Sequence, residues 1–92
     1  MAMGAVKHDG SALEKACYEL GPFNIRVNAV APGLTETEMG HYKSEDELQK
    51  VIDRTGMQRM ARPEEIADAV LFLASKQASF VNGEVVRVDG GR

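Results

Sequence analysis

The sequence predicts an α/β fold built from two parallel strands that are connected through helices. Two short runs, 25–32 and 84–88, are rich in β-branched residues and alternate as strands do, and stretches with helical spacing lie before and between them. About fifty residues separate the two runs, which is ample for a parallel connection. Because two strands are too few for a stable sheet, we expect the end of a larger fold, incomplete as a domain.

Composition narrows the class of protein. The 92 residues are 43% hydrophobic and carry a net charge of −3, with no cationic block, so neither nucleic acid nor a membrane is an expected partner. No apolar run approaches the ~20 residues of a membrane-spanning helix. The single Cys17 and the distant His8 and His41 predict no disulfide and no metal site, and a reduced, cytoplasmic setting is the default.

The first clear helix is predicted from Ser11. Ser11-x-x-Glu14 has the form of a capping box, and apolar residues follow at helical spacing: Leu13, Ala16, Cys17 and Leu20. Gly21-Pro22 then ends the helix, with Gly21 as the expected C-terminal cap.

A strand and its loop come next. In Ile25–Gly33, Val27, Ala29 and Ala31 alternate with other side chains, and Pro32 ends the strand because it has no backbone N–H to donate. A polar loop with two threonines follows Gly33. Because ligands of open α/β sheets bind outside the carboxyl ends of the strands, this loop is a candidate binding wall.

Two more helices and a strand complete the pattern. Ser44-x-x-Glu47 is a second capping box before a narrow apolar stripe. Pro63 begins the strongest helix, where Glu64-Glu65 complement the helix dipole and the wide apolar surface of residues 66–74 predicts burial on more than one side. Asn82-Gly83 marks the turn into the last strand.

Four motifs in this order are similar to the C-terminal third of the short-chain dehydrogenases/reductases, which are NAD(P)-dependent oxidoreductases with one Rossmann-type domain. The matching segments are Asn24-Ile25-Arg26-Val27-Asn28-Ala29-Val30-Ala31-Pro32-Gly33, Thr37-Glu38-Met39, Arg62-Pro63-Glu64-Glu65-Ile66-Ala67 with Val70-Leu71-Phe72-Leu73-Ala74-Ser75, and Gly83 through Val88-Asp89-Gly90-Gly91. The nearest branch is that of 3-oxoacyl-carrier-protein reductase or glucose dehydrogenase. The resemblance implies that residues 1–92 are the C-terminal part of a doubly wound parallel sheet, with about two strands and three to four helices.

The resemblance also implies cofactor contacts. Backbone groups near Pro32, Gly33 and Thr35 would contact the nicotinamide ribose and carboxamide, and the Thr37 hydroxyl would bond the carboxamide or a phosphate. The alternative is that Pro-Gly only ends a strand and that both threonines are solvated.

Lys7 is the candidate catalytic residue by the same resemblance. The family's Tyr-x-x-x-Lys motif corresponds to Met3-Gly4-Ala5-Val6-Lys7, so methionine stands where the tyrosine acid/base should be and cannot exchange a proton. Lys7 is therefore either a remaining cofactor contact or an ordinary exposed lysine. By motif, Tyr18 and Tyr42 do not replace the tyrosine.

Two functions follow from these observations. The first is a fragment of an NAD or NADP oxidoreductase acting on a carbonyl/alcohol pair, inactive by itself because the glycine-rich phosphate loop, the serine and the tyrosine are missing. The second is a non-catalytic interaction module that associates with itself, or with a full-length relative, through residues 63–75 and 84–91. The substrate, and the choice between NAD and NADP, are not encoded in these residues.

Overall fold

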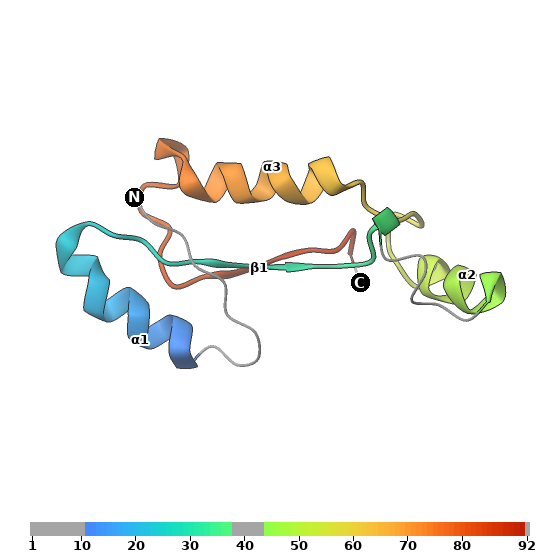
Figure 1. Cartoon of the computed structure of the whole chain (residues 1–92), viewed down its shortest axis with the longest axis horizontal. Helices are drawn as coiled ribbons and strands as arrows, with labels where there is room; N and C mark the ends of the chain where they lie inside the picture. The colour runs from blue at the N-terminus through green and yellow to red at the C-terminus, as the bar shows by residue number, and fades with distance from the viewer. Residues whose placement is uncertain (1–10, 38–43, 92) are drawn as a thin grey trace. The chain divides into compact units, whose positions relative to one another are not determined.

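The computed structural model describes residues 11–37 and 44–91 (Figure 1). Its helices are α1 (Ser11–Leu20), α2 (Glu45–Asp53) and α3 (Pro63–Ala74), with short 3-10 turns η1 (Gly21–Phe23) and η3 (Lys76–Ala78). Strands β1 (Ala29–Pro32) and β2 (Val85–Val88) form a two-stranded parallel sheet. The predicted α/β pattern of helix, strand, two helices and strand is confirmed. Among the helices of the described residues, none has both the length and the hydropathy needed to span a membrane.

The chain divides into two compact units. Of the described residues, the first unit takes those up to Val30 together with Ala69–Val86, and the second takes those within 31–68 together with those from Arg87 onward. Both strands and α3 contribute residues to each unit. Within the first unit Ala29 N donates to Glu84 O at 2.9 Å, and within the second Gly33 N donates to Val88 O at 3.0 Å.

In the first unit, α1 packs one face against the start of the sheet. Leu13, Val27 and Ala29 form the buried cluster, with Ala16 against it. The predicted cap at Gly21 is wrong, because the chain continues as η1 and ends in a left-handed turn at Asn24, with φ 60° and its N–H bonded to Gly21 O. Proline fits the first turn of such a helix, and asparagine tolerates the left-handed conformation. Ser11 is the first residue of α1, and the hydrogen bonds of its capping box stay a prediction.

Just before β1 and β2, the side-chain amides of two asparagines hydrogen-bond the backbone of the opposite segment. Val27 N donates to Asn82 Oδ1 at 3.0 Å, and Glu84 N donates to Asn28 Oδ1 at 3.0 Å. The strand expected from Ile25 begins only at Ala29; before that point one direct backbone bond, from Gly83 N to Val27 O at 2.8 Å, lies between the two asparagine contacts. These amides satisfy backbone groups that would otherwise be buried without a partner.

Arg26 is buried and closes the C-terminal end of α3. Its guanidinium donates to Leu73 O at 2.6 Å, to Ser75 O at 3.3 Å and to Val81 O at 3.0 Å. The last carbonyls of a helix have no partner within the helix, and a cation is favourable there. One arginine therefore joins the strand segment, the end of α3 and the turn before β2.

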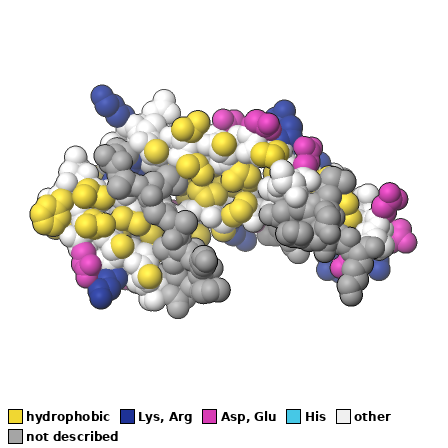
Figure 2. Space-filling view, viewed as in Figure 1, with side chains coloured by type: hydrophobic (Ala, Val, Ile, Leu, Met, Phe, Trp, Pro, Cys, Tyr) yellow, Lys and Arg dark blue, Asp and Glu magenta, His cyan; other side chains and the backbone are white. Residues whose placement is uncertain are grey.

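The α3 part of the first unit is more exposed than its composition predicts. Leu73 is its buried residue, whereas Val70, Leu71 and Phe72 are 37%, 66% and 48% exposed. Figure 2 shows hydrophobic side chains along the visible face of this helix. Within the described residues the expectation of burial on more than one side is wrong, because Leu73 is the buried residue of this helix and its neighbours Leu71 and Phe72 are exposed.

In the second unit, α2 begins as the sequence predicts. Ser44 is its N-cap, and the Ser44 Oγ accepts from Glu47 N at 3.1 Å. The helix ends at Asp53. The next turn is held to the end of the chain, since Gly56 N donates to Gly91 O and Met57 N donates to Gly90 O, both at 2.9 Å.

Candidate functional site

The loop that follows β1 lies in the second unit and begins at Pro32-Gly33. A Cβ built on Gly33 would lie 2.7 Å from Asp89 Cβ and 2.8 Å from Asp89 Cα. These separations are too short for any residue that carries a Cβ, so only glycine fits at this position. Gly33 is therefore required by the close approach of the residue that follows β2, and this requirement holds with or without a ligand.

Thr35 is fixed on both sides by backbone pairing. It forms an isolated parallel bridge with Ala61, whose N–H donates to Leu34 O at 2.9 Å and whose carbonyl accepts from Glu36 N at 3.1 Å. Thr35 is 7% exposed. We call residues 33–37 the threonine loop; its centre is held in place by Ala61, in the linker before α3.

The two threonine hydroxyls form a pair. Thr35 Oγ1 lies 2.9 Å from Thr37 Oγ1, and either can donate to the other. Two hydroxyls carry two protons, and their mutual bond uses one of them. The second proton and the remaining lone pairs can serve a bound group. The alternative of two solvated threonines is wrong for Thr35, which is buried, whereas Thr37 is exposed.

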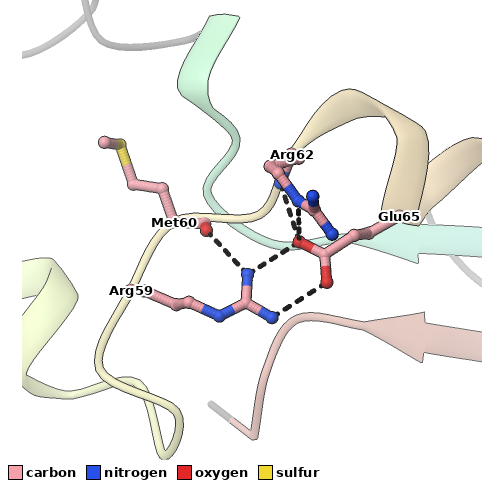
Figure 3. A network of polar contacts seen from close by, with 4 residues as sticks. All are labelled: Arg59, Met60, Arg62 and Glu65. Carbon is pink, nitrogen blue, oxygen red and sulfur yellow. Dashed lines mark hydrogen bonds and ion pairs between the residues drawn. The ribbon is translucent and has the colours of Figure 1, made fainter.

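A cluster of ion pairs joins the linker between α2 and α3 to the first turn of α3 (Figure 3). The Arg59 guanidinium donates to both carboxylate oxygens of Glu65, at 2.7 and 2.8 Å, and Glu65 Oε1 also accepts from Arg62 N at 3.0 Å. These hydrogen bonds, that from Arg59 above all, lower the pKa of Glu65 to about 2, and the carboxylate in turn raises the pKa of Arg59. From the sequence, Glu65 was assigned only to the helix dipole.

A hollow of about 320 Å³ lies beside this cluster, within the second unit. Leu34 is the member of the threonine loop that lines it. The other lining residues come from the linker, the start of α3 and the end of the chain: Thr55, Met57, Arg59, Ala61, Glu65, Arg87, Val88, Asp89, Gly90 and Gly91. Sequence reasoning missed this hollow, because it forms from segments that are far apart in the chain.

The predicted site residues thus fall into two groups. Pro32 is the last residue of β1, and Gly33, Thr35 and Thr37 follow it in the threonine loop, all within the second unit. Lys7 and Met3 lie outside the described residues, so the structure gives no position for the candidate catalytic lysine. Among residues 11–37 and 44–91, no three His, Cys, Asp or Glu side chains gather as a metal site would require.

Comparison with known proteins assigns the chain to a class. All of residues 1–92 match the family described as enoyl-(acyl carrier protein) reductase. The chain therefore belongs to this family, which is part of the short-chain dehydrogenases/reductases. The α/β arrangement of two parallel strands and three helices is that of a partial Rossmann-like unit, and the resemblance drawn from the four motifs is confirmed.

Individual relatives are oxidoreductases by name. The chain is 44% identical over 91 residues to an uncharacterized oxidoreductase, YmfI, of Bacillus subtilis, covering 99% of this chain and 36% of the relative. It is 49% identical over 73 residues to the 3-oxoacyl-(acyl-carrier-protein) reductase FabG of Aquifex aeolicus, covering 79% and 29%. It is 51% identical over 72 residues to a 3alpha-hydroxysteroid dehydrogenase of Mediterraneibacter gnavus, covering 78% and 29%. The chain spans about a third of the length of these relatives.

Proposed function

We propose that the chain supplies the nicotinamide-side wall of an NAD(P)-dependent oxidoreductase that acts on a carbonyl/alcohol pair. In this proposal residues 1–92 are the C-terminal part of one cofactor-binding domain, in a cytoplasmic protein. The observation that carries the proposal is the hydroxyl pair of Thr35 and Thr37, held 2.9 Å apart in the loop after β1 of a chain in this family.

The residues of the threonine loop fit a nicotinamide in their chemistry. A carboxamide offers a carbonyl acceptor and N–H donors, and a threonine hydroxyl can meet either. Thr37 is exposed and Thr35 holds its hydroxyl from the buried side, so the exposed oxygen is oriented before any ligand arrives. Backbone groups of Pro32 and Gly33 would border the ribose. Fixed polar groups of this kind orient a ligand at little reorganisation cost.

The cofactor, when bound, supplies the hydride, and the loop's task is to bind and orient the ring. The chain offers no proton donor of the family's kind, because Met3 stands at the tyrosine position and cannot exchange a proton. The 92 residues also contain no Gly-x-x-x-Gly-x-Gly sequence for the pyrophosphate. We therefore expect the chain by itself to hold a nicotinamide weakly and to turn over no substrate, with Lys7 as a candidate ribose contact.

Nuclear magnetic resonance tests this proposal directly. Titration of the ¹⁵N-labelled chain with NAD, NADH, NADP or NADPH is expected to shift the amide signals of residues 33–37 at millimolar cofactor. Thr37→Val should abolish these shifts and Thr37→Ser should retain them, because serine keeps the hydroxyl. Shifts confined to other segments, or none at all, would contradict the assignment. NAD(P)H consumption by the purified chain would overturn the proposed inactivity.

A second function is favoured by the exposed apolar side chains of the first unit. Leu71 and Phe72 on α3 and Val85 on β2 are 66%, 48% and 44% exposed. A module that associates with itself through residues 63–75 and 84–91 would cover them. Light scattering would then give a mass above 10.0 kDa that falls to the monomer in Leu71→Glu. A well-folded monomer of the unmodified chain would rule this function out.

A further inference from the structure

We infer that Arg59 and Glu65 are a positioning pair for the threonine loop, acting through Ala61. The inference rests on the proposed function, because it names the residues that hold the nicotinamide wall in place. All of the residues involved belong to the second unit.

The first step is the fixing of the linker on the helix. Arg59 donates two parallel hydrogen bonds to the Glu65 carboxylate, and Arg62 N donates a third to the same group. Arg59 Nη1 also donates to Met60 O at 3.2 Å. Residues 59–62 are therefore attached at both ends to one carboxylate in the first turn of α3 (Figure 3). Bidentate arginine–carboxylate pairs fix orientation as well as distance.

The second step leads from the linker to the loop. Ala61 lies inside the fixed segment, and its N–H and carbonyl bond the residues on either side of Thr35. The path from Glu65 to the Thr37 hydroxyl thus runs through backbone hydrogen bonds and the single hydroxyl contact between Thr35 and Thr37. A change in the position of Ala61 must move Thr35, since both of its flanking backbone groups are bonded to that residue.

The ordinary interpretation of such a pair is a surface salt bridge with little effect. The Arg59 and Glu65 side chains are 45% and 28% exposed, and exposed pairs contribute little to global stability. That interpretation predicts no local change when the pair is removed. Positioning predicts a local change in the loop and little change elsewhere, so the two can be separated by experiment.

The test is amide hydrogen exchange of the full chain at neutral pH, with Glu65→Gln and its matched control Glu64→Gln. Glu64 is the neighbouring, exposed glutamate of the same helix turn. We expect Glu65→Gln to raise the exchange rates of the Glu36 and Ala61 amides about tenfold, by local opening. Amides of the first unit, such as Ala29, should change less than about twofold. Glu64→Gln should leave all of these rates unchanged.

Arg59→Lys is the second variant. Lysine keeps the charge and loses the bidentate fork, so the rates of the same amides should rise by less than in Glu65→Gln. A uniform rise in both units, an unchanged Glu36 rate, or an equal effect of Glu64→Gln would overturn the inference. An unfolded chain in both variants would also overturn it, because the pair would then support the whole fold.

The exchange measurement needs no cofactor, so its result is separate from that of the nicotinamide titration. If the loop opens in Glu65→Gln while the unmodified chain shows no cofactor shifts, the pair positions the loop and the proposed function fails. If the cofactor shifts appear and the exchange rates do not change, the wall binds the nicotinamide without help from this pair.

Discussion

Replacing Gly83 with alanine would place a methyl group against the Cys17 thiol in the first unit. Gly83 has φ +76°, and a Cβ built there lies 2.8 Å from Cys17 Sγ and 3.5 Å from Cys17 Cβ. The backbone conformation alone costs an L-residue about 1–2 kcal/mol. Forcing an extra methyl into a filled space costs about 1–3 kcal/mol. We therefore expect Gly83→Ala to lower the free energy of unfolding by about 3 kcal/mol.

A double-mutant cycle separates the two costs. In a Cys17→Ala background the nearest atom becomes the Cβ at 3.5 Å, an ordinary contact, so only the backbone cost remains. Gly83→Ala should then cost about 1–2 kcal/mol, and the interaction energy of the pair should exceed about 1 kcal/mol. Urea unfolding of the four proteins, followed by circular dichroism, measures these values. Equal costs of Gly83→Ala in both backgrounds would refute the steric argument, and a cost below about 0.5 kcal/mol would refute the geometry of the turn.

Three further predictions follow from single residues. Arg26→Met removes the donor to three carbonyls, so the free energy of unfolding measured in urea should fall by about 3 kcal/mol. The control Lys15→Met, at an exposed position, should cost less than about 0.5 kcal/mol. Equal effects would contradict the stabilising role of the buried guanidinium. Gln58 has φ 53°, so Gln58→Gly should raise stability by about 0.5–1 kcal/mol, and a lower melting temperature would argue against this. The pKa of Glu65 is lowered to about 2 from 4.5, so its stabilising contribution is complete above pH 4.5 and is lost as the pH falls towards 2. Carboxyl ¹³C titration should find that pKa, and should find a higher pKa in Arg59→Met that is still below 4.5, because the Arg62 amide continues to donate to the carboxylate.

The parts of the fold that depend on neighbouring residues could be predicted from the sequence. The N-cap of α2 was predicted at Ser44 because the hydroxyl reaches an amide three residues away. The strand that ends at Pro32 and the helix that begins at Pro63 were predicted because proline restricts its own backbone. Family membership followed because several such local signals occur in one order.

The parts that depend on distant residues could not be predicted in this way. Arg26 is buried because carbonyls 47 to 55 positions later surround its guanidinium, and no local pattern encodes that contact. The linker that holds Thr35 was also missed, since the pairing of Ala61 with the loop carries no sequence period. In the candidate site, the threonines were predicted from a family motif. The residues that fix their positions were found only from the hydrogen bonds.

The bonds from Gly56 and Met57 to the last glycines make the chain's end part of the linker's support. A carboxypeptidase that removed the residues after Asp89 would take away the acceptors at Gly90 and Gly91. Two linker amides would then exchange with solvent, a few residues before the segment that pairs with the threonine loop. An affinity tag or fusion at this terminus would add its bulk beside the same contacts, so in any assay of the loop the tag belongs at the other end.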